Sequence, residues 1–188
     1  MEALLASFVA AALAEWGDKT QILVIALAVR YRRPIPILAG IAVAAAANSA
    51  LAAFGGILVH DRVTLRALSL LLALALVFAG VAGLIRPRKD DPAAASRFGP
   101  FLTSLGAFFV LEFGDKTQFL TFSLAAQFNT LAFAAAGATA GILVSSVPAA
   151  ILGDRLSEAV PLRAVRLGLG LLFLAIGLIV GLSALRLL

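Results

Sequence analysis

The sequence predicts an all-α membrane protein in which six transmembrane helices form two inverted repeats of three helices each. The first observation behind this prediction is composition: of 188 residues, 62% are hydrophobic and 13% are charged, with a mean hydropathy of +1.07. That is more apolar than a soluble domain of this size can bury. The second observation is that the sequence repeats itself at an offset of 97 residues.

Six apolar runs are long enough to cross a bilayer, which takes about 20 helical residues. They are continuous and lack the alternation of barrel strands, so they favour helices. We predict spans at 3–29, 35–59, 65–85, 101–126, 131–152 and 165–185. The first run has no basic start and continues through a charged motif, so we expect it to be retained as a span rather than cleaved as a signal peptide. The short loops leave no room for a soluble catalytic domain.

The repeat is clearest in one hexapeptide: E-W-G-D-K-T at 15–20 returns as E-F-G-D-K-T at 112–117. The same ungapped offset pairs four of the six glycines in the first half with glycines in the second. Each half contains an odd number of predicted spans, so the second copy must enter the membrane from the opposite face, as in many secondary transporters. We assign 1–88 to the first repeat, 89–98 to a cytoplasmic linker and 99–188 to the second, inverted repeat.

Basic residues gather at one set of loops. The first, third and fifth loops carry ten Lys or Arg residues, and the opposite side carries three. The positive-inside rule therefore places those loops in the cytoplasm and both termini outside. The sequence pI is about 10.7, but the basic residues lie at span ends, so orientation explains them better than a nucleic-acid partner.

Six ionisable groups lie within the two motifs, although a charge at the bilayer centre costs roughly 2.5 to 3.5 kcal/mol on insertion scales. On a continuous helix, positions i, i+3 and i+4 share a face, so Glu15, Asp18 and Lys19 are expected to point together, as are their repeat partners. The four carboxylates and two ammonium groups sum to a formal charge of −2. A divalent cation would balance that charge.

The oxygen atoms around the motifs form a hard donor set suited to Ca²⁺, Mn²⁺ or Mg²⁺. Softer metals are poorly served, because the chain has no cysteine, its one methionine is Met1, and its one histidine, His60, lies at a span end. Gly17 and Gly114 allow either close helix contact or a local break that frees carbonyl groups for a cation. Beside the acids, the candidate supporting residues are Lys19, Lys116, Thr20, Thr117, Gln21, Gln118, Asn48 and Ser145.

The supporting residues have expected roles of different kinds. The threonines and glutamines would be neutral donors, and the two lysines would hold the acids when no metal is bound. Asn48 and Ser145 would either form interhelical hydrogen bonds or complete the ion site. We expect Trp16 and Phe113 to be packing residues.

The doubled E-x-G-D-K-T motif in a six-span duplicate resembles the GDT family of membrane cation transporters, and the resemblance covers essentially the whole chain. Members of that family exchange Mn²⁺ or Ca²⁺ for protons in bacterial plasma membranes and the eukaryotic Golgi. The resemblance implies that Glu15, Asp18, Glu112 and Asp115 bind the metal. It also implies a secondary transporter of a bacterial inner membrane that exports Mn²⁺, with Ca²⁺ as a second candidate, in exchange for protons. The metal would be cargo, with no cofactor and no nucleic-acid partner, and the sequence leaves the oligomeric state open.

Two alternatives come from other functional classes. A membrane-embedded hydrolase of lipid phosphates could use carboxylates and a metal, but it would need phosphate-binding arginines, and neither hexapeptide contains one. A purely structural bundle could use Glu15 with Lys19, and Glu112 with Lys116, as buried ion pairs. Such pairs are a costly way to add stability.

Overall fold

The structure, a computed structural model, describes residues 1–85 and 98–187. Those residues are helical with short connections, so the predicted all-α class is confirmed. The helices are α1 (Glu2–Glu15), α2 (Lys19–Tyr31), α3 (Pro34–His60), α4 (Leu65–Leu84), α5 (Pro100–Glu112), α6 (Lys116–Phe128), α7 (Leu131–Leu152), α8 (Asp154–Ala159) and α9 (Leu162–Ala184). Residues 86–97, which include most of the predicted linker and the basic residues Arg86, Arg88, Lys89 and Arg97, lie outside the described residues.

Four of the predicted spans are single helices, α3, α4, α7 and α9, and each is long and apolar enough to cross a membrane. The short helix α8 was not predicted. The spans expected at 3–29 and 101–126 are each divided at the motif into two helices of 13 or 14 residues. Of the two possibilities that the sequence left open at Gly17 and Gly114, the local break is therefore the one that forms.

Glycine explains why both motif helices break at the same place. Gly17 and Gly114 each have φ of +74°, a left-handed conformation that costs an L-residue with a side chain roughly 1 to 2 kcal/mol. The next residue, Asp18 or Asp115, has extended backbone and precedes the first turn of the following helix. The motif therefore encodes a helix end, a turn and a helix start.

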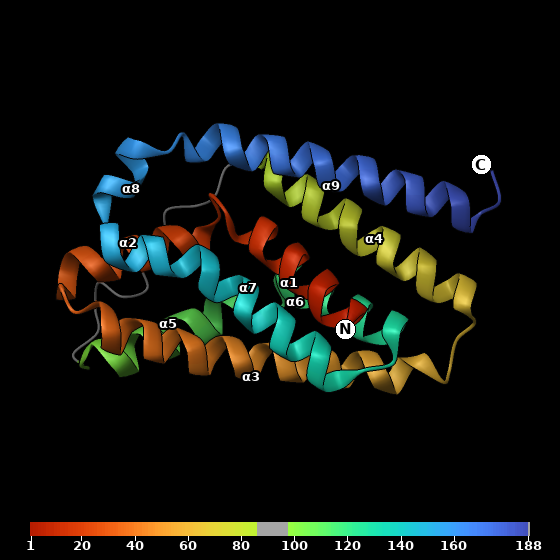
Figure 1. Cartoon of the computed structure of the whole chain (residues 1–188), viewed down its shortest axis with the longest axis horizontal. Helices are drawn as coiled ribbons and strands as arrows, with labels where there is room; N and C mark the ends of the chain where they lie inside the picture. Colours follow the sequence, from red (N-terminus) through yellow and green to blue (C-terminus); the bar gives the residue numbers. More distant parts are fainter. Residues whose placement is uncertain (86–97, 188) are drawn as a thin grey trace.

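Helices from one half pack against helices from the other, α1 against α7 and α3 against α5 and α6 (Figure 1). The close approaches come in pairs at the repeat offset. A Cβ added to Gly40 would lie 2.5 Å from the carbonyl oxygen of Phe101, and one added to Gly137 would lie 2.3 Å from that of Leu4. Both glycines therefore allow helix backbones to touch.

A second pair, α4 and α9, runs side by side along one edge of the molecule (Figure 1). Here the paired contacts join Gly80 to Leu174 and Gly177 to Val77, again at equivalent positions of the two halves. The outer faces of these helices expose leucine, isoleucine and phenylalanine side chains. Exposed apolar surface of this extent suits lipid, and the protein is an integral membrane protein.

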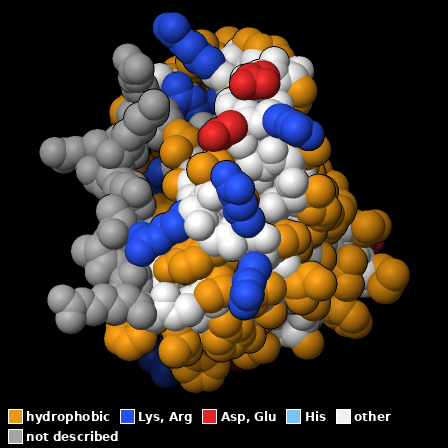
Figure 2. Space-filling view, turned by 90° about the vertical axis from the view of Figure 1, so that its left-hand side faces the viewer, with side chains coloured by type: hydrophobic (Ala, Val, Ile, Leu, Met, Phe, Trp, Pro, Cys, Tyr) orange, Lys and Arg blue, Asp and Glu red, His pale blue; other side chains and the backbone are white. Residues whose placement is uncertain are grey.

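One end of the molecule is charged. Figure 2 shows Lys, Arg, Asp and Glu side chains gathered on the end where α8 lies, with apolar side chains around them. The exposed basic residues near this end in the described chain are Arg30, Arg32, Arg33, Arg155 and Arg163. We call this the basic end.

Candidate functional site

The two motif breaks are joined by ion pairs that cross between the halves. The Nζ atom of Lys19 lies 2.8 Å from Oδ1 of Asp115. In the equivalent contact, Lys116 pairs with Asp18, and its Nζ also lies 3.6 Å from Oδ2 of Asp115. The expected pairs within each motif, Glu15 with Lys19 and its repeat partner, are not the pairs that form.

The break is the physical reason for this difference. The prediction placed Glu15, Asp18 and Lys19 on one face of one helix, and this is wrong because α1 ends at Glu15 and α2 begins at Lys19. The extended residue Asp18 changes the direction of the chain between them. Each lysine is thereby presented to the other half.

Three of the four predicted acids come together. Glu15, Glu112 and Asp115 each offer a carboxylate oxygen, and these oxygens lie within 4.8 Å of one another. Both glutamates are buried, each with 1% of its surface exposed. Asp18 is outside this group and is occupied by the Lys116 ammonium. The carboxylate cluster is drawn from both halves, and its oxygens suit a hard divalent cation.

The two glutamates have unlike surroundings despite their equivalent positions. Both motif threonines donate to Glu15: Thr20 to one oxygen and Thr117, at 2.5 Å, to the other. Within the described residues, neither carboxylate oxygen of Glu112 has a hydrogen-bond partner. A buried polar atom without a partner costs free energy unless something else satisfies it. Glu112 is therefore the acid left available to a ligand.

The motif glutamines brace the two breaks. Oε1 of Gln21 accepts from the Gly17 N–H at 2.8 Å, and its Nε2 donates to the Ser145 carbonyl at 3.1 Å. Gln118 accepts from the Gly114 N–H at 2.6 Å and donates to the Asn48 carbonyl at 3.3 Å. Each amide thus ties a break to a long helix of the opposite half. In this structure each glutamine Oε1 accepts a hydrogen bond from a backbone N–H group. That the two glutamines also bind the metal stays a prediction.

Asn48 and Ser145 lie at equivalent places but differ in contacts. The Nδ2 of Asn48 donates to the Phe109 carbonyl at 3.1 Å, and its Oδ1 is buried with no partner in the described chain. The Ser145 hydroxyl donates to the Ile142 carbonyl of its own helix at 2.8 Å. Asn48, Glu112 and Thr121 help to line one small gap. Of these two equivalent residues, Asn48 is therefore the one with an unpaired side-chain oxygen, and it lies beside the unpaired carboxylate of Glu112.

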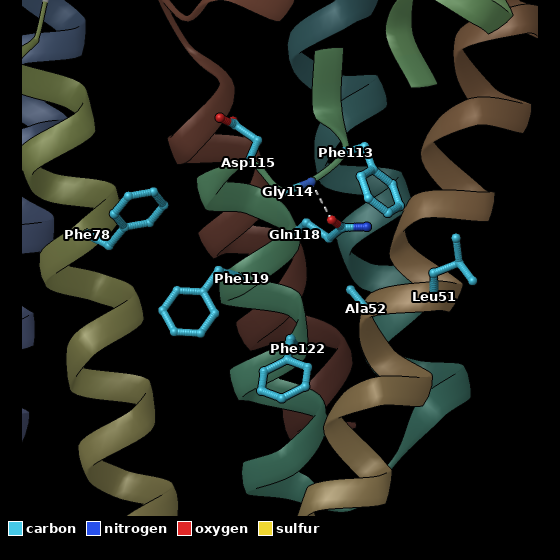
Figure 3. A pocket seen from close by; sticks show the side chains of 9 residues that line it. All are labelled: Leu51, Ala52, Phe78, Phe113, Gly114, Asp115, Gln118, Phe119 and Phe122. Atoms are coloured by element: carbon cyan, nitrogen blue, oxygen red, sulfur yellow. Dashed lines mark hydrogen bonds between the residues drawn. The ribbon is translucent and has the colours of Figure 1, made fainter. Parts of the chain in front are cut away.

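A cavity of about 450 Å³ opens beside the second motif. Figure 3 shows Asp115 and Gln118 at its wall with Phe78 from α4 and Phe119 and Phe122 from α6. Phe113, expected to be a packing residue, has 61% of its surface exposed and lines this cavity.

The first motif is covered instead. A Cβ added to Gly17 would lie 2.6 Å from the Leu162 carbonyl oxygen and 2.9 Å from Cβ of Arg166, whereas one added to Gly114 would meet nothing within 4 Å. Arg166 is buried, and its guanidinium donates to the Ile85 carbonyl. The start of α9 therefore covers the break at Gly17, whereas the equivalent break at Gly114 is open.

The sequence reasoning missed Thr121, Leu162 and Arg166. Thr121 follows Thr117 by one helical turn, and that spacing could have drawn attention to it. The contact of α9 with Gly17 joins residues about 145 positions apart in the chain. No local sequence pattern predicts such a contact.

Comparison with known proteins agrees with this geometry. The family described as "Divalent cation/proton antiporter GDT1" matches residues 3–91 and 100–187. A protein of Vibrio cholerae serotype O1 (strain ATCC 39541 / Classical Ogawa 395 / O395), described as "Putative manganese exporter", is 41% identical over 181 residues, which cover 95% of this chain and 90% of that protein. No solved structure matches the chain. With a family match over both halves and a relative of this similarity, the chain belongs to the divalent cation/proton antiporter GDT1 family, and it is a divalent-cation transporter rather than an enzyme.

Proposed function

We propose that the protein is a secondary active transporter that exports Mn²⁺, with Ca²⁺ as a second substrate, in exchange for protons. The observation that carries the proposal is the meeting of Glu15, Glu112 and Asp115 from both halves in a membrane protein. Carboxylates at membrane depth that face the interior of a bundle mark ion pathways. The similarity to a described manganese exporter supports Mn²⁺ as the first substrate to test.

Competition for the same carboxylate oxygens would couple the two ions. A carboxyl group that carries a proton cannot also bind a metal through that oxygen, so uptake of one ion releases the other. Lys19 and Lys116 supply the counter-charge when the metal is absent, because each pairs with an aspartate of the opposite motif. When Mn²⁺ arrives, we expect Lys19 to release Asp115, which then joins Glu15 and Glu112 as a ligand.

The architecture proposed for this transporter is the six-span inverted repeat, with the divided pairs α1–α2 and α5–α6 each making one crossing. Its support is the pairing of contacts at the 97-residue offset, seen in the ion pairs, the glutamine braces and the glycine contacts. Broken helices that meet at the midplane are a recurring design of transporter ion sites. The units 1–88, 89–98 and 99–188 remain our proposed division.

The unequal surroundings of the two breaks support one state of an alternating-access cycle. The cavity beside Asp115 extends along α6 as far as Phe122 and reaches Leu51 in the later part of α3, so it lies toward the end opposite the basic end. We propose that the basic end is cytoplasmic, that both termini are outside and that the membrane is a bacterial inner membrane. In that frame, the structure is open toward the outside and closed by α9 on the cytoplasmic side.

The direct test measures flux in proteoliposomes that contain purified protein. An imposed pH gradient should drive Mn²⁺ accumulation against the Mn²⁺ gradient, and collapse of the pH gradient should stop it. Mn²⁺ and Ca²⁺ fluxes that both ignore the pH gradient would show that the exchange mechanism is wrong.

The shared site is tested with Glu15→Gln, Asp18→Asn, Glu112→Gln and Asp115→Asn. Each should abolish or severely reduce flux while the purified protein remains monodisperse. Loss of flux in the first-half variants, with near-normal binding and flux in Glu112→Gln and Asp115→Asn, would refute a site shared by the two halves.

A further inference from the structure

A pocket of about 390 Å³ at the basic end lies outside the ion site. It is formed where α2 ends, α3 begins and α7 passes into α8. Its walls include Val29, Ile151 and Leu152, which expose 45%, 64% and 44% of their surface. The pocket therefore borders lipid-facing apolar surface on one side and the charged end of the molecule on the other.

Two arginines and one aspartate give the pocket its charge. Arg32 and Arg155 line it and are exposed, and within residues 1–85 and 98–187 neither guanidinium takes part in a hydrogen bond or ion pair. Asp154 is the one acid among its lining residues in the described chain. The formal charge of +1 matches a group with a single negative charge. Figure 2 shows the charged end to which these residues belong.

Arg32 occupies a backbone position that does not favour arginine. It ends α2 with φ of 52°, in the left-handed region that L-residues with a side chain rarely adopt. Its repeat partner Asn129 ends α6 with φ of 48°, and asparagine tolerates that region. The partner of Arg155 is Leu58. The left-handed helix end is thus common to both halves, whereas the helix α8 that carries Arg155 follows a break at Gly153 and Leu58 lies within the continuous helix α3. Neither arginine has an arginine as its repeat partner.

We propose that this pocket binds an anionic phospholipid, with the headgroup phosphodiester on Arg32 and Arg155 and an acyl chain along Val29, Ile151 and Leu152. Guanidinium groups bind phosphate oxygens in bidentate fashion. Basic pockets between transmembrane helices are suited to anionic headgroups. A phospholipid would contact both the two arginines, through its phosphate, and the apolar wall, through its acyl chain. Free phosphate would contact the arginines alone and leave the apolar wall uncovered. This proposal requires a membrane protein but does not depend on proton exchange.

The test compares ligands on purified protein in a neutral detergent. Phosphatidylglycerol should raise the melting temperature and stay bound in native mass spectrometry. Phosphatidylcholine, whose headgroup has no net charge, should do neither at the same concentration. An equal shift with phosphatidylcholine would overturn the role of the arginines, and an equal shift with inorganic phosphate alone would identify a site for soluble anions.

The repeat supplies the variants. Arg32→Asn introduces the residue that the other half carries at the same left-handed helix end, so it should melt no lower than wild type without lipid. Arg155 is exposed within α8, where leucine is a good helix former, so Arg155→Leu should also fold. The double variant should need at least ten-fold more phosphatidylglycerol for the same shift. Arg62→Gln, at the opposite end, should behave as wild type. A double variant that keeps wild-type sensitivity refutes the proposal, while Mn²⁺ flux in phosphatidylcholine vesicles tests the transport function separately.

Discussion

At the scale of single residues, the two motif lysines show how a duplicated sequence acquires unequal parts. Lys19 and Lys116 occupy equivalent positions and make equivalent cross-half ion pairs. The Lys19 side chain is 32% exposed and that of Lys116 is 4% exposed. Water screens the first pair, while the second lies inside the protein. The Lys116 ion pair should therefore matter more for stability than the Lys19 ion pair.

This difference predicts unequal effects of two matched substitutions. Lys116→Met removes one partner of a buried pair, so the free energy of unfolding should fall by about 3 to 5 kcal/mol. Lys19→Met should cost about 1 kcal/mol or less, because its pair is partly solvated. Saturating Mn²⁺ should raise the melting temperature of Lys116→Met more than that of wild type, because the metal replaces the missing positive charge beside Asp18 and Asp115.

Thermal unfolding of both variants with and without Mn²⁺ checks this prediction. Equal losses in the two variants would contradict the assigned difference in burial. A Lys116→Met protein that Mn²⁺ does not stabilise would contradict the view that the lysine and the metal serve the same carboxylates.

At the scale of helices, the breaks in α1–α2 and α5–α6 organise the site. Each break ends a helix at a glutamate and starts the next at a lysine, with glycine in the left-handed region between them. The glutamine one turn later fixes the glycine N–H and reaches the opposite half. The hexapeptide therefore specifies a turn as well as a set of charges.

The breaks predict a graded response to alanine. Gly17→Ala and Gly114→Ala both force a side chain into the left-handed region, at roughly 1 to 2 kcal/mol. At Gly17 the new Cβ would also meet the Leu162 carbonyl oxygen at 2.6 Å, while at Gly114 it meets nothing within 4 Å. Gly17→Ala should therefore be the more destabilising, by about a further 1 to 3 kcal/mol for overpacking.

Melting temperatures in one detergent provide the comparison, with Gly106→Ala as the control. Gly106 lies within α5 with open space around it, so alanine there should be neutral or stabilising by up to about 1 kcal/mol. Equal destabilisation at Gly17 and Gly114 would mean that α9 does not cover the first break.

The sequence predicted the helical class, the four long apolar helices and the convergence of the two motifs, because these follow from composition and from the repeat. It did not choose between a continuous and a broken motif helix, since Gly17 is compatible with both. The cross-half pairing of Lys19 with Asp115 follows from the break and could not be derived without it. The covering of Gly17 but not of Gly114 depends on long-range packing by α9, which no local sequence pattern encodes.

At the scale of the whole molecule, near-symmetric contacts coexist with an asymmetric opening. The paired glycine contacts and ion pairs relate the halves closely, yet a cavity of about 450 Å³ lies beside the second motif, and α9 covers Gly17 while Gly114 has open space around it. In the alternating-access cycle that we propose, the two halves would exchange these unequal contacts. Such an exchange would close the cavity at Asp115 and open one at Asp18.

Orientation decides which compartment that cavity faces, and single cysteines can measure it. The chain contains no cysteine, so an introduced one is the sole target for an impermeant maleimide. Arg33, between α2 and α3, and Arg62, between α3 and α4, are both exposed and lie at opposite ends of α3. Because the basic loops are expected in the cytoplasm, Arg62→Cys should react in intact cells and Arg33→Cys only after permeabilisation. The two arginine-to-cysteine changes are matched in chemistry, and cells with the unmodified chain give the background. Labelling of Arg33→Cys but not Arg62→Cys in intact cells would reverse the orientation, and the cavity beside Asp115 would then open toward the cytoplasm.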